Sequence, residues 1–193
     1  MGHAAISLKG PTMSRIGLLQ KPWPDAFAAT VAKVAAPGAE PLSLFTAMGH
    51  SQKALDRFLA GAVPGKGALD LHTREIVIER TAAQTGCEYE WGIHTKVFAA
   101  KAGLSPEQVQ STYSGAANDG NWDEKDAAVI ATVDALLANK KLSDDEFARI
   151  TAHFDTEQLI EIIQLVAFYH GVALFTGAIA LPSEPGMPRF PAA

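Results

Sequence analysis

The sequence predicts an all-α protein. Predicted helices follow one another from Asp25 to Leu181, separated by capping and stop signals, and no stretch shows the sustained apolar and polar alternation of a half-buried strand. The 193 residues are 48% hydrophobic, which is enough for one well-buried domain, and no shift in composition marks a second domain. We therefore expect a compact multi-helix domain.

The first helices are defined by their stop signals. A helix from Asp25 to Ala36 is predicted to end at Pro37-Gly38, and a second from Leu42 to Ala60 is predicted to end at Gly61, because proline and glycine terminate helices. A third helix is predicted from Leu69 to Gln84.

The next helices are predicted from capping signals. Thr85 and Glu88 have the spacing of a capping box, in which each side chain satisfies a backbone amide of the first turn, so a helix should begin there. It should run to about Ala102 and end at Gly103. The run Ser105-Pro-Glu-Gln108 opens the following helix with a cap, a proline at the first position and a glutamine at the third.

Three more helices complete the predicted bundle. They run from Asp123 to Lys140, from Ser143 to Phe154 and from Thr156 to Leu181. The second opens with a capping box formed by Ser143 and Glu146, and the third follows Asp155 as a cap.

The last predicted helix contains the most apolar part of the chain. From Ile162 to Leu181 there is no Asp, Glu, Lys or Arg over twenty residues, a length that could span a bilayer. Gln164, Tyr169 and His170 lie within the stretch and no basic cluster flanks it, which favours a buried central helix that also serves as an oligomer interface. We therefore expect no membrane partner.

The C-terminal tail carries a proline at every third position, at Pro182, Pro185, Pro188 and Pro191. This period places the prolines on one edge of a polyproline II helix. Two interpretations stay open: an extended arm that lies over a neighbouring subunit, or a disordered tail that only stops the last helix.

Charge and cysteine content limit the class of protein. The net charge is −5 and no long basic stripe is present, which argues against a nucleic-acid partner and favours a small molecule or another protein chain. Cys87 is the only cysteine, so the chain can form no internal disulfide, as is common in a reducing compartment. The stretch from Met1 to Pro24 lacks the apolar region of a secretory signal, so we expect a cytoplasmic protein.

A cluster of proton-handling residues is the most informative feature of the chain. Cys87, Glu90 and His94 recur at helical spacing, and on an α-helix they would share a sector of roughly 60°. His94 is the natural proton donor or acceptor, since an imidazole titrates near working pH. Glu90, one turn earlier, is expected to orient the ring of His94, although an ordinary surface pair is the alternative.

Two further residues join the candidate site. Glu75 stands twelve residues before Cys87 on the preceding predicted helix, where an antiparallel helix pair would bring it near the cluster. Cys87 is interpreted either as a small buried hydrophobic residue or as a participant in the chemistry. Glu90 and His94 alone do not complete a metal site, so we expect no metal.

The residues Arg74-Glu75, Glu90-Trp-Gly-Ile-His94 and Gly103-Leu104 resemble those of the carboxymuconolactone decarboxylase family, which includes the alkyl hydroperoxidase D-like proteins. The resemblance covers roughly residues 42–181 and extends more loosely to Tyr169-His170. It implies an N-terminal extension with a short helix over residues 1–41, the family's helical domain over residues 42–181 and a proline-rich tail over residues 182–193.

In the peroxidase branch of the family, the pattern is a glutamate, two cysteines three residues apart and a histidine. This chain matches it at Glu75, Cys87 and His94, but Glu90 stands where the second cysteine would be. A self-contained disulfide cycle is therefore impossible, and any peroxidase activity would use Cys87 alone with an external thiol.

The decarboxylase branch is similar in having no thiol pair and a carboxylate four residues before the histidine, as Glu90 and His94 have. The resemblance to this branch implies an enzyme without a cofactor that acts on an unsaturated lactone acid from aromatic catabolism. It also implies a subunit that assembles into trimers or hexamers with the site near a subunit boundary.

Three functional hypotheses follow. The leading one is a cofactor-independent decarboxylase or related acid-base lyase for a small carboxylated, lactone-like metabolite, with His94 transferring the proton, Glu90 orienting His94, and Glu75 and Cys87 lining or polarising the pocket. The alternatives are a one-cysteine peroxidase that uses Cys87 and a non-catalytic oligomeric binding protein.

Overall fold

The computed structural model describes residues 14–35, 38–62 and 67–191, and throughout them the regular secondary structure is helical. The prediction of an all-α fold is therefore confirmed. Ala36 and Pro37, the predicted end of the first helix, lie outside the described residues, as does part of the N-terminal stretch on which the cytoplasmic prediction rests. The helices are α1 (Asp25–Val34), α2 (Ser43–Met48), α3 (Gln52–Ala62), α4 (Leu71–Gln84), α5 (Glu88–His94), the π-helical segment η1 (Thr95–Ala99), α6 (Pro106–Ser114), α7 (Glu124–Asn139), α8 (Asp144–Thr151) and α9 (Thr156–Ala178).

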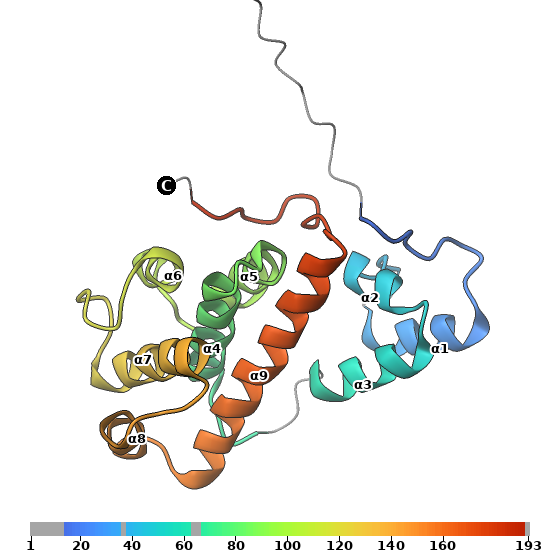
Figure 1. Cartoon of the computed structure of the whole chain (residues 1–193). Helices are drawn as coiled ribbons and strands as arrows, with labels where there is room; N and C mark the ends of the chain where they lie inside the picture. Colours follow the sequence, from blue (N-terminus) through green and yellow to red (C-terminus); the bar gives the residue numbers. More distant parts are fainter. Residues whose placement is uncertain (1–13, 36–37, 63–66, 192–193) are drawn as a thin grey trace, which may run out of the picture.

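Figure 1 shows α9 running diagonally between two groups of helices, with α4 to α8 on one side and α1 to α3 on the other. Three apolar clusters hold the groups together. The first fills the space between α4, α7, α8 and α9 around Ile76, Val129 and Ile162. The second joins α2, α4, α5 and α9, and the third lies between α1 and α3 around Phe27 and Leu55.

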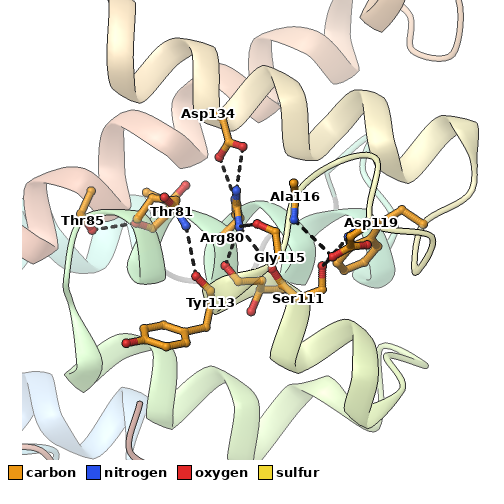
Figure 2. Close-up of polar contacts among 12 residues, drawn as sticks. Arg80, Thr81, Thr85, Ser111, Tyr113, Gly115, Ala116, Asp119 and Asp134 are labelled. Atoms are coloured by element: carbon orange, nitrogen blue, oxygen red, sulfur yellow. Dashed lines mark hydrogen bonds and ion pairs between the residues drawn. The ribbon is translucent and has the colours of Figure 1, made fainter. Parts of the chain in front are cut away.

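Helix α4 lies at the centre of the larger group and carries several buried polar side chains. Among them, Arg80 is 4% exposed and donates to both carboxylate oxygens of Asp134 on α7 at 2.7 Å. Its Nη1 atom donates to the carbonyls of Ser111, Thr112 and Gly115 at 3.0–3.2 Å (Figure 2). A buried charge is tolerated only when it is paired and hydrogen-bonded, and this arginine thereby joins α4 to α7 and to the end of α6.

Several predicted caps are present. Ser105 and Ser143 each form the predicted capping box, with Gln108 and Glu146 respectively. Asp155 caps α9 and forms a capping box of its own with Gln158. These signals act within a few residues, which is why the sequence alone predicts them well.

The predicted capping box between Thr85 and Glu88 is wrong. Gly86 adopts a left-handed backbone with φ of 70°, so the chain turns sharply between α4 and α5. The Thr85 hydroxyl donates back to the carbonyl of Thr81 at 2.7 Å. The carboxylate of Glu88 instead accepts from Arg189 and from the amide of Phe190 in the tail.

The single helix predicted from Leu42 to Ala60 is also wrong, because the chain forms α2 and α3 there. Helix α2 ends at Gly49. The Ser51 hydroxyl then accepts from the amide of Ala54 at 3.3 Å, so a serine cap restarts the chain as α3.

The helix that carries His94 does not continue as a regular α-helix to Ala102. It changes to π-helical geometry over Thr95–Ala99, directly after His94. A turn follows over residues 100–103, in which Gly103, the predicted stop, has a φ of 76°. A π-helical turn is rare and recurs at functional sites.

Helix α9 ends at Ala178, three residues before the predicted Leu181, and its surface is only partly buried. By length and composition this helix could cross a membrane, with a mean hydropathy of 1.7 over its most apolar window, of which 33% is buried. The expectation of a buried central helix holds for only part of its surface, since Ile160 is 56% exposed and Leu174 is 66% exposed. Within the described residues, α9 is covered on the sides that face the two helix groups, and the remaining stripe stays open.

The proline-rich tail packs against its own subunit. The ring of Phe190 stacks on Tyr113, with centroids 4.6 Å apart, and lies 5.4 Å from the ring of Trp91. Gly92 allows this contact, because a side chain there would meet the carbonyl of Pro188 at 2.5 Å. The tail up to Pro191 is therefore an ordered strap over α5 and α6.

Candidate active site

His94 is the last residue of α5 and lies at the centre of a buried polar cluster. Its Nδ1 atom is 2.6 Å from Oε2 of Glu75, which projects from α4. The side chains of His94 and Glu75 are 7% and 0% exposed. A carboxylate only accepts hydrogen bonds, so Nδ1 carries the proton and donates a hydrogen bond to Glu75. This bond fixes the tautomer of His94 and leaves Nε2 for other partners.

Two side chains surround the Nε2 atom of His94. The hydroxyl of Tyr169, on α9, lies at 3.2 Å and donates to Nε2 when the ring is neutral. Oε2 of Glu90, one turn earlier on α5, lies at 3.6 Å. Residues from three helices therefore meet at one imidazole: Glu75 behind the ring, and Tyr169 and Glu90 in front of it.

Burial sets the protonation of the two groups in front of the ring. It raises the pKa of Glu90, and the nearby positive form of His94 opposes this shift only in part. The pKa of Tyr169 is also raised, first by burial and then by the negative charges of Glu90 and Glu75. Both groups therefore favour their protonated, neutral forms and can donate hydrogen bonds.

A cavity of about 510 Å³ opens in front of the cluster. His94, Glu90, Tyr169 and Arg74 contribute its inner polar groups. The remaining walls are mostly apolar, and the connection between α1 and α2 contributes many of them. These apolar lining residues are Val34, Ala35, Ala39, Pro41, Leu42, Leu44, Phe45, Phe58, Leu59, Ile93 and Phe98. A mostly apolar pocket with a few convergent polar groups is typical of a small-molecule site.

Cys87 lies apart from this cavity. Its thiol is 3.4 Å from the hydroxyl of Thr176 on α9, and it lines a different pocket, under the tail. Burial is the main cause that raises the pKa of the thiol, which disfavours the thiolate. The expectation that Cys87 shares a face with Glu90 and His94 is wrong, because Cys87 is the N-cap of α5 with a non-helical ψ of 74°.

The structure changes the predicted role of one residue and adds another. The hydrogen bond that orients His94 comes from Glu75, whereas Glu90 stands on the opposite, cavity side of the ring. The added residue is Tyr169, for which the sequence predicted no role in the site. Its neighbour His170 is half-buried and is not among the residues that line the cavity.

Across residues 14–35, 38–62 and 67–191, no group of three or more His, Cys, Asp or Glu side chains is placed to hold a metal ion.

Comparison with solved structures shows the fold class. An uncharacterized peroxidase-related protein from Silicibacter sp. TM1040 superposes with a TM-score of 0.76 at 17% identity, over 95% of this chain and 100% of that one. An alkylhydroperoxidase AhpD core protein from Ralstonia eutropha JMP134, also peroxidase-related and uncharacterized, gives 0.76 at 16% identity, over 91% and 95% of the two chains. A protein of unknown function from Agrobacterium tumefaciens gives 0.60 at 18% identity, over 89% and 99%. The fold is therefore that of the alkyl hydroperoxidase D-like helical proteins.

Residues 50–134 match the model of the carboxymuconolactone decarboxylase family. No protein of curated function matches the chain. This match agrees with the resemblance of the sequence to that family, and it covers fewer than half of the residues of the chain.

The region that matches the family model contains only part of the candidate site. It contains Glu75, Glu90 and His94, which form the proton-handling cluster. Tyr169 and the cavity walls before residue 50 lie outside it. The family match therefore covers the histidine and its carboxylates, whereas most of the apolar residues that line the cavity lie outside it.

Proposed function

We propose that this protein is a cofactor-independent decarboxylase, or a related acid-base lyase, that acts on a small carboxylated and lactone-like metabolite. The observation that carries the proposal is the arrangement of His94: Glu75 holds Nδ1 at 2.6 Å, and Nε2 stands between Tyr169 and Glu90 at the wall of a mostly apolar cavity. An imidazole held in one tautomer beside a substrate-sized cavity is suited to general acid-base catalysis.

The proposed reaction uses His94 as the acid. When the bond between the carboxyl carbon and the rest of the substrate breaks, CO2 leaves and its electron pair remains on the substrate as an enolate-like anion. The protonated ring of His94 donates its Nε2 proton to that carbon and becomes neutral. Such a transfer contributes about 10² to 10⁴ in rate.

Glu75, Tyr169 and Glu90 support this step in different ways. The negative charge of Glu75 stabilises the positive ring of His94 before the transfer. Tyr169 and Glu90, both in their neutral forms, can hydrogen-bond an oxygen of the enolate-like anion. In this account Glu75 is a positioning residue, and His94, Tyr169 and Glu90 touch the substrate.

A one-cysteine peroxidase is the competing proposal, because two of the similar structures are described as peroxidase-related. In that reaction the thiolate of Cys87 would attack the peroxide and become a sulfenic acid, the peroxide would leave as an alcohol or water, and an external thiol would reduce the sulfenic acid. The burial of Cys87, its raised pKa and its place in a pocket other than the one beside His94 all favour the acid-base proposal.

One paired experiment distinguishes the two proposals. The purified protein, without any added cofactor, is assayed for CO2 release from a panel of lactone acids and β-keto acids, and the intact mass of Cys87 is followed during peroxide treatment. The acid-base proposal predicts CO2 release that survives Cys87→Ser and a thiol that reacts slowly. Fast, saturable formation of sulfenic acid without any CO2 release would refute the acid-base proposal and support the peroxidase.

Self-association is part of the proposal. The open stripe of α9 carries Ile160 and Leu174, and it has no charged residue from Ile162 onward. Exposed apolar side chains along one helix face are typical of an interface between subunits. We take a second copy of this chain to be the partner of this stripe.

A further inference from the structure

Arg74 contributes a positive charge to the cavity next to the proton-handling cluster. It lies in the first turns of α4, directly before Glu75, and is one of the residues that line the cavity. Its Nε atom is 3.5 Å from Oε1 of Glu75, and both atoms are buried without a hydrogen bond to any described residue. Its charge also acts on Tyr169, whose pKa it lowers against the effect of burial. The guanidinium therefore belongs to the same electrostatic cluster as His94 and Tyr169.

The charges around His94 come close to balance only when the ring is neutral. Glu75 is its hydrogen-bonded carboxylate, and Glu90 and Tyr169 favour their neutral forms. Glu79, one turn after Glu75 on α4, has a pKa raised to about 8 by burial and by the charge of Glu75, so it is also mostly neutral near pH 7. The charged groups next to the ring of His94 are then Arg74 and Glu75.

Protonation of His94 adds one positive charge to this cluster, and the described residues around the ring supply no second carboxylate that favours its charged form. The buried carboxylate of Asp126 lies outside the cluster and is paired with His72. The other charged residues that line the cavity, Lys33 and Glu40, are exposed at its rim and are of opposite sign. An uncompensated charge in a buried site is costly, so the protonated ring needs an anion from outside. A negatively charged ligand beside Arg74 would provide it.

We propose that Arg74 anchors the carboxylate of the ligand in this cavity and that His94 takes up a proton when the anion binds. This inference rests on the proposed function, because it assigns the source of the proton that His94 donates. A guanidinium binds a carboxylate through two parallel hydrogen bonds, so the preferred ligand is a small organic acid with a planar carboxylate and an apolar body. The apolar walls and the volume of about 510 Å³ fit a ligand of that kind.

Coupling between anion binding and proton uptake would keep the net charge of the site constant through the whole reaction. The bound anion carries one negative charge and the protonated His94 carries one positive charge. After CO2 has left and the proton has moved from Nε2 to carbon, both charges have disappeared together. The product has then lost the group that Arg74 binds, which favours its release, and by linkage the loss of the anion disfavours reprotonation of His94 until the next substrate arrives.

Calorimetry with a simple probe tests the inference without any turnover. Benzoate is titrated at pH 8, where an ordinary imidazole is neutral, in two buffers with different ionisation enthalpies, and benzamide serves as the neutral analogue. The titration uses the unaltered protein and Glu79→Gln, because the carboxyl of Glu79 has a pKa of about 8 and its amide replacement cannot take up a proton. The inference predicts that benzoate binds, that benzamide binds more weakly, and that close to one proton is taken up per benzoate.

Three variants assign the effect to residues. Arg74→Gln should weaken benzoate binding about tenfold or more, with little change for benzamide. His94→Gln should bind benzoate without proton uptake. Arg57→Gln is the matched control: it removes an exposed arginine of α3 that does not line the cavity, and it should change neither result.

Several results would overturn the inference. They are undetectable benzoate binding at millimolar concentration, equal affinity for benzoate and benzamide, benzoate binding without proton uptake, or loss of binding in Lys33→Gln while Arg74→Gln still binds. Because the readout is binding, its failure is separate from failure of the proposed reaction. Benzoate binding with proton uptake, but without CO2 release from any acid, would refute the proposed reaction and support the anion site. CO2 release together with benzoate binding that takes up no proton would support the reaction and refute the inference.

Discussion

The Nδ1 atom of His94 and the Oε2 atom of Glu75 lie 2.6 Å apart, although nineteen positions separate the two residues along the chain. The bond joins the end of α5 to the first half of α4 across the turn at Gly86. A carboxylate in this position holds one tautomer of the ring and stabilises its positive form. The relationship explains why Glu75 is completely buried, since a buried carboxylate needs a partner of this kind.

Glu75→Gln should lower turnover strongly while the fold persists. The amide can offer its oxygen to Nδ1, but it carries no negative charge to stabilise the protonated ring, and it can also hold the wrong tautomer. We expect kcat to fall by about 10² to 10⁴. Steady-state kinetics on the best substrate of the panel measures the fall, and nitrogen NMR of the His94 ring reports the tautomer. A Glu75→Gln enzyme with normal kcat would show that the bond has no role in the reaction.

Tyr169→Phe removes only the hydroxyl that faces Nε2 of His94. Because Tyr169 supplies one of the two neutral donors at the cavity wall, we expect a moderate loss of kcat, about tenfold, with a smaller change in KM. The same kinetics on His170→Phe provide a control on the next residue of α9. Equal effects of the two variants would argue that the hydroxyl does not take part.

Cys87→Ser should leave decarboxylation nearly unchanged. The thiol contacts Thr176 and lines a pocket other than the one beside His94. A buried serine is more polar than a cysteine, so a small loss of stability, about 1 kcal/mol, is expected in a urea titration. If kcat instead fell a hundredfold in a variant that remained folded, Cys87 would have to be returned to the reaction.

Glu79 should make the protein less stable at higher pH. The pKa of its carboxyl is near 8 in the folded protein and near 4.5 when unperturbed, so between these values the folded state holds one more proton than the unfolded state. The contribution of this group to the free energy of unfolding is therefore fully present at low pH and is lost as the pH rises toward 8, by about 1.4 kcal/mol per pH unit.

Glu79→Gln tests this dependence, because the amide does not titrate. Urea denaturation at about pH 5.5 and pH 8 should show a smaller pH-dependent loss of stability in Glu79→Gln than in the unaltered protein. Glu107→Gln, at an exposed position of α6, is a suitable control. The same pH dependence in all three proteins would contradict the assignment to Glu79.

Leu174→Glu should weaken self-association. Leu174 is the most exposed large apolar residue of the open stripe on α9, and a charge there would be desolvated in any interface that the stripe forms. Light scattering after size-exclusion chromatography should show an assembly for the unaltered protein and a smaller species for Leu174→Glu. An unaltered protein that stays monomeric at high micromolar concentration would contradict the proposed role of the stripe.

The features that the sequence predicted correctly are mostly local. The capping boxes of α6 and α8 and the stop at Gly103 depend on residues within one or two turns, and they are present as predicted. The spacing between Glu75 and Cys87 also indicated the correct helix pair, because a short turn between two antiparallel helices brings nearby positions together.

The features that could not be predicted from the sequence depend on distant contacts or on the exact start of a helix. Tyr169 meets His94 from 75 residues away, and no periodicity in α9 distinguishes a tyrosine that faces the cavity from one that only packs. Helical spacing predicts Cys87 on the same face as Glu90 and His94. This spacing does not apply to Cys87, because α5 begins one residue later, at Glu88. The Glu88 carboxylate was assigned to a local cap, but the tail competes for it from about a hundred residues away.

The proton-transfer role of His94 is tested most directly by comparing CO2 release in the unaltered protein, in His94→Ala and in His170→Ala, with the fold checked by circular dichroism. His170 is a half-buried histidine that is not among the cavity-lining residues, so it controls for the loss of an imidazole as such. The account predicts that His94→Ala loses at least about a hundredfold in rate while His170→Ala keeps nearly all of it. A folded His94→Ala protein that releases CO2 as fast as the unaltered one would contradict it.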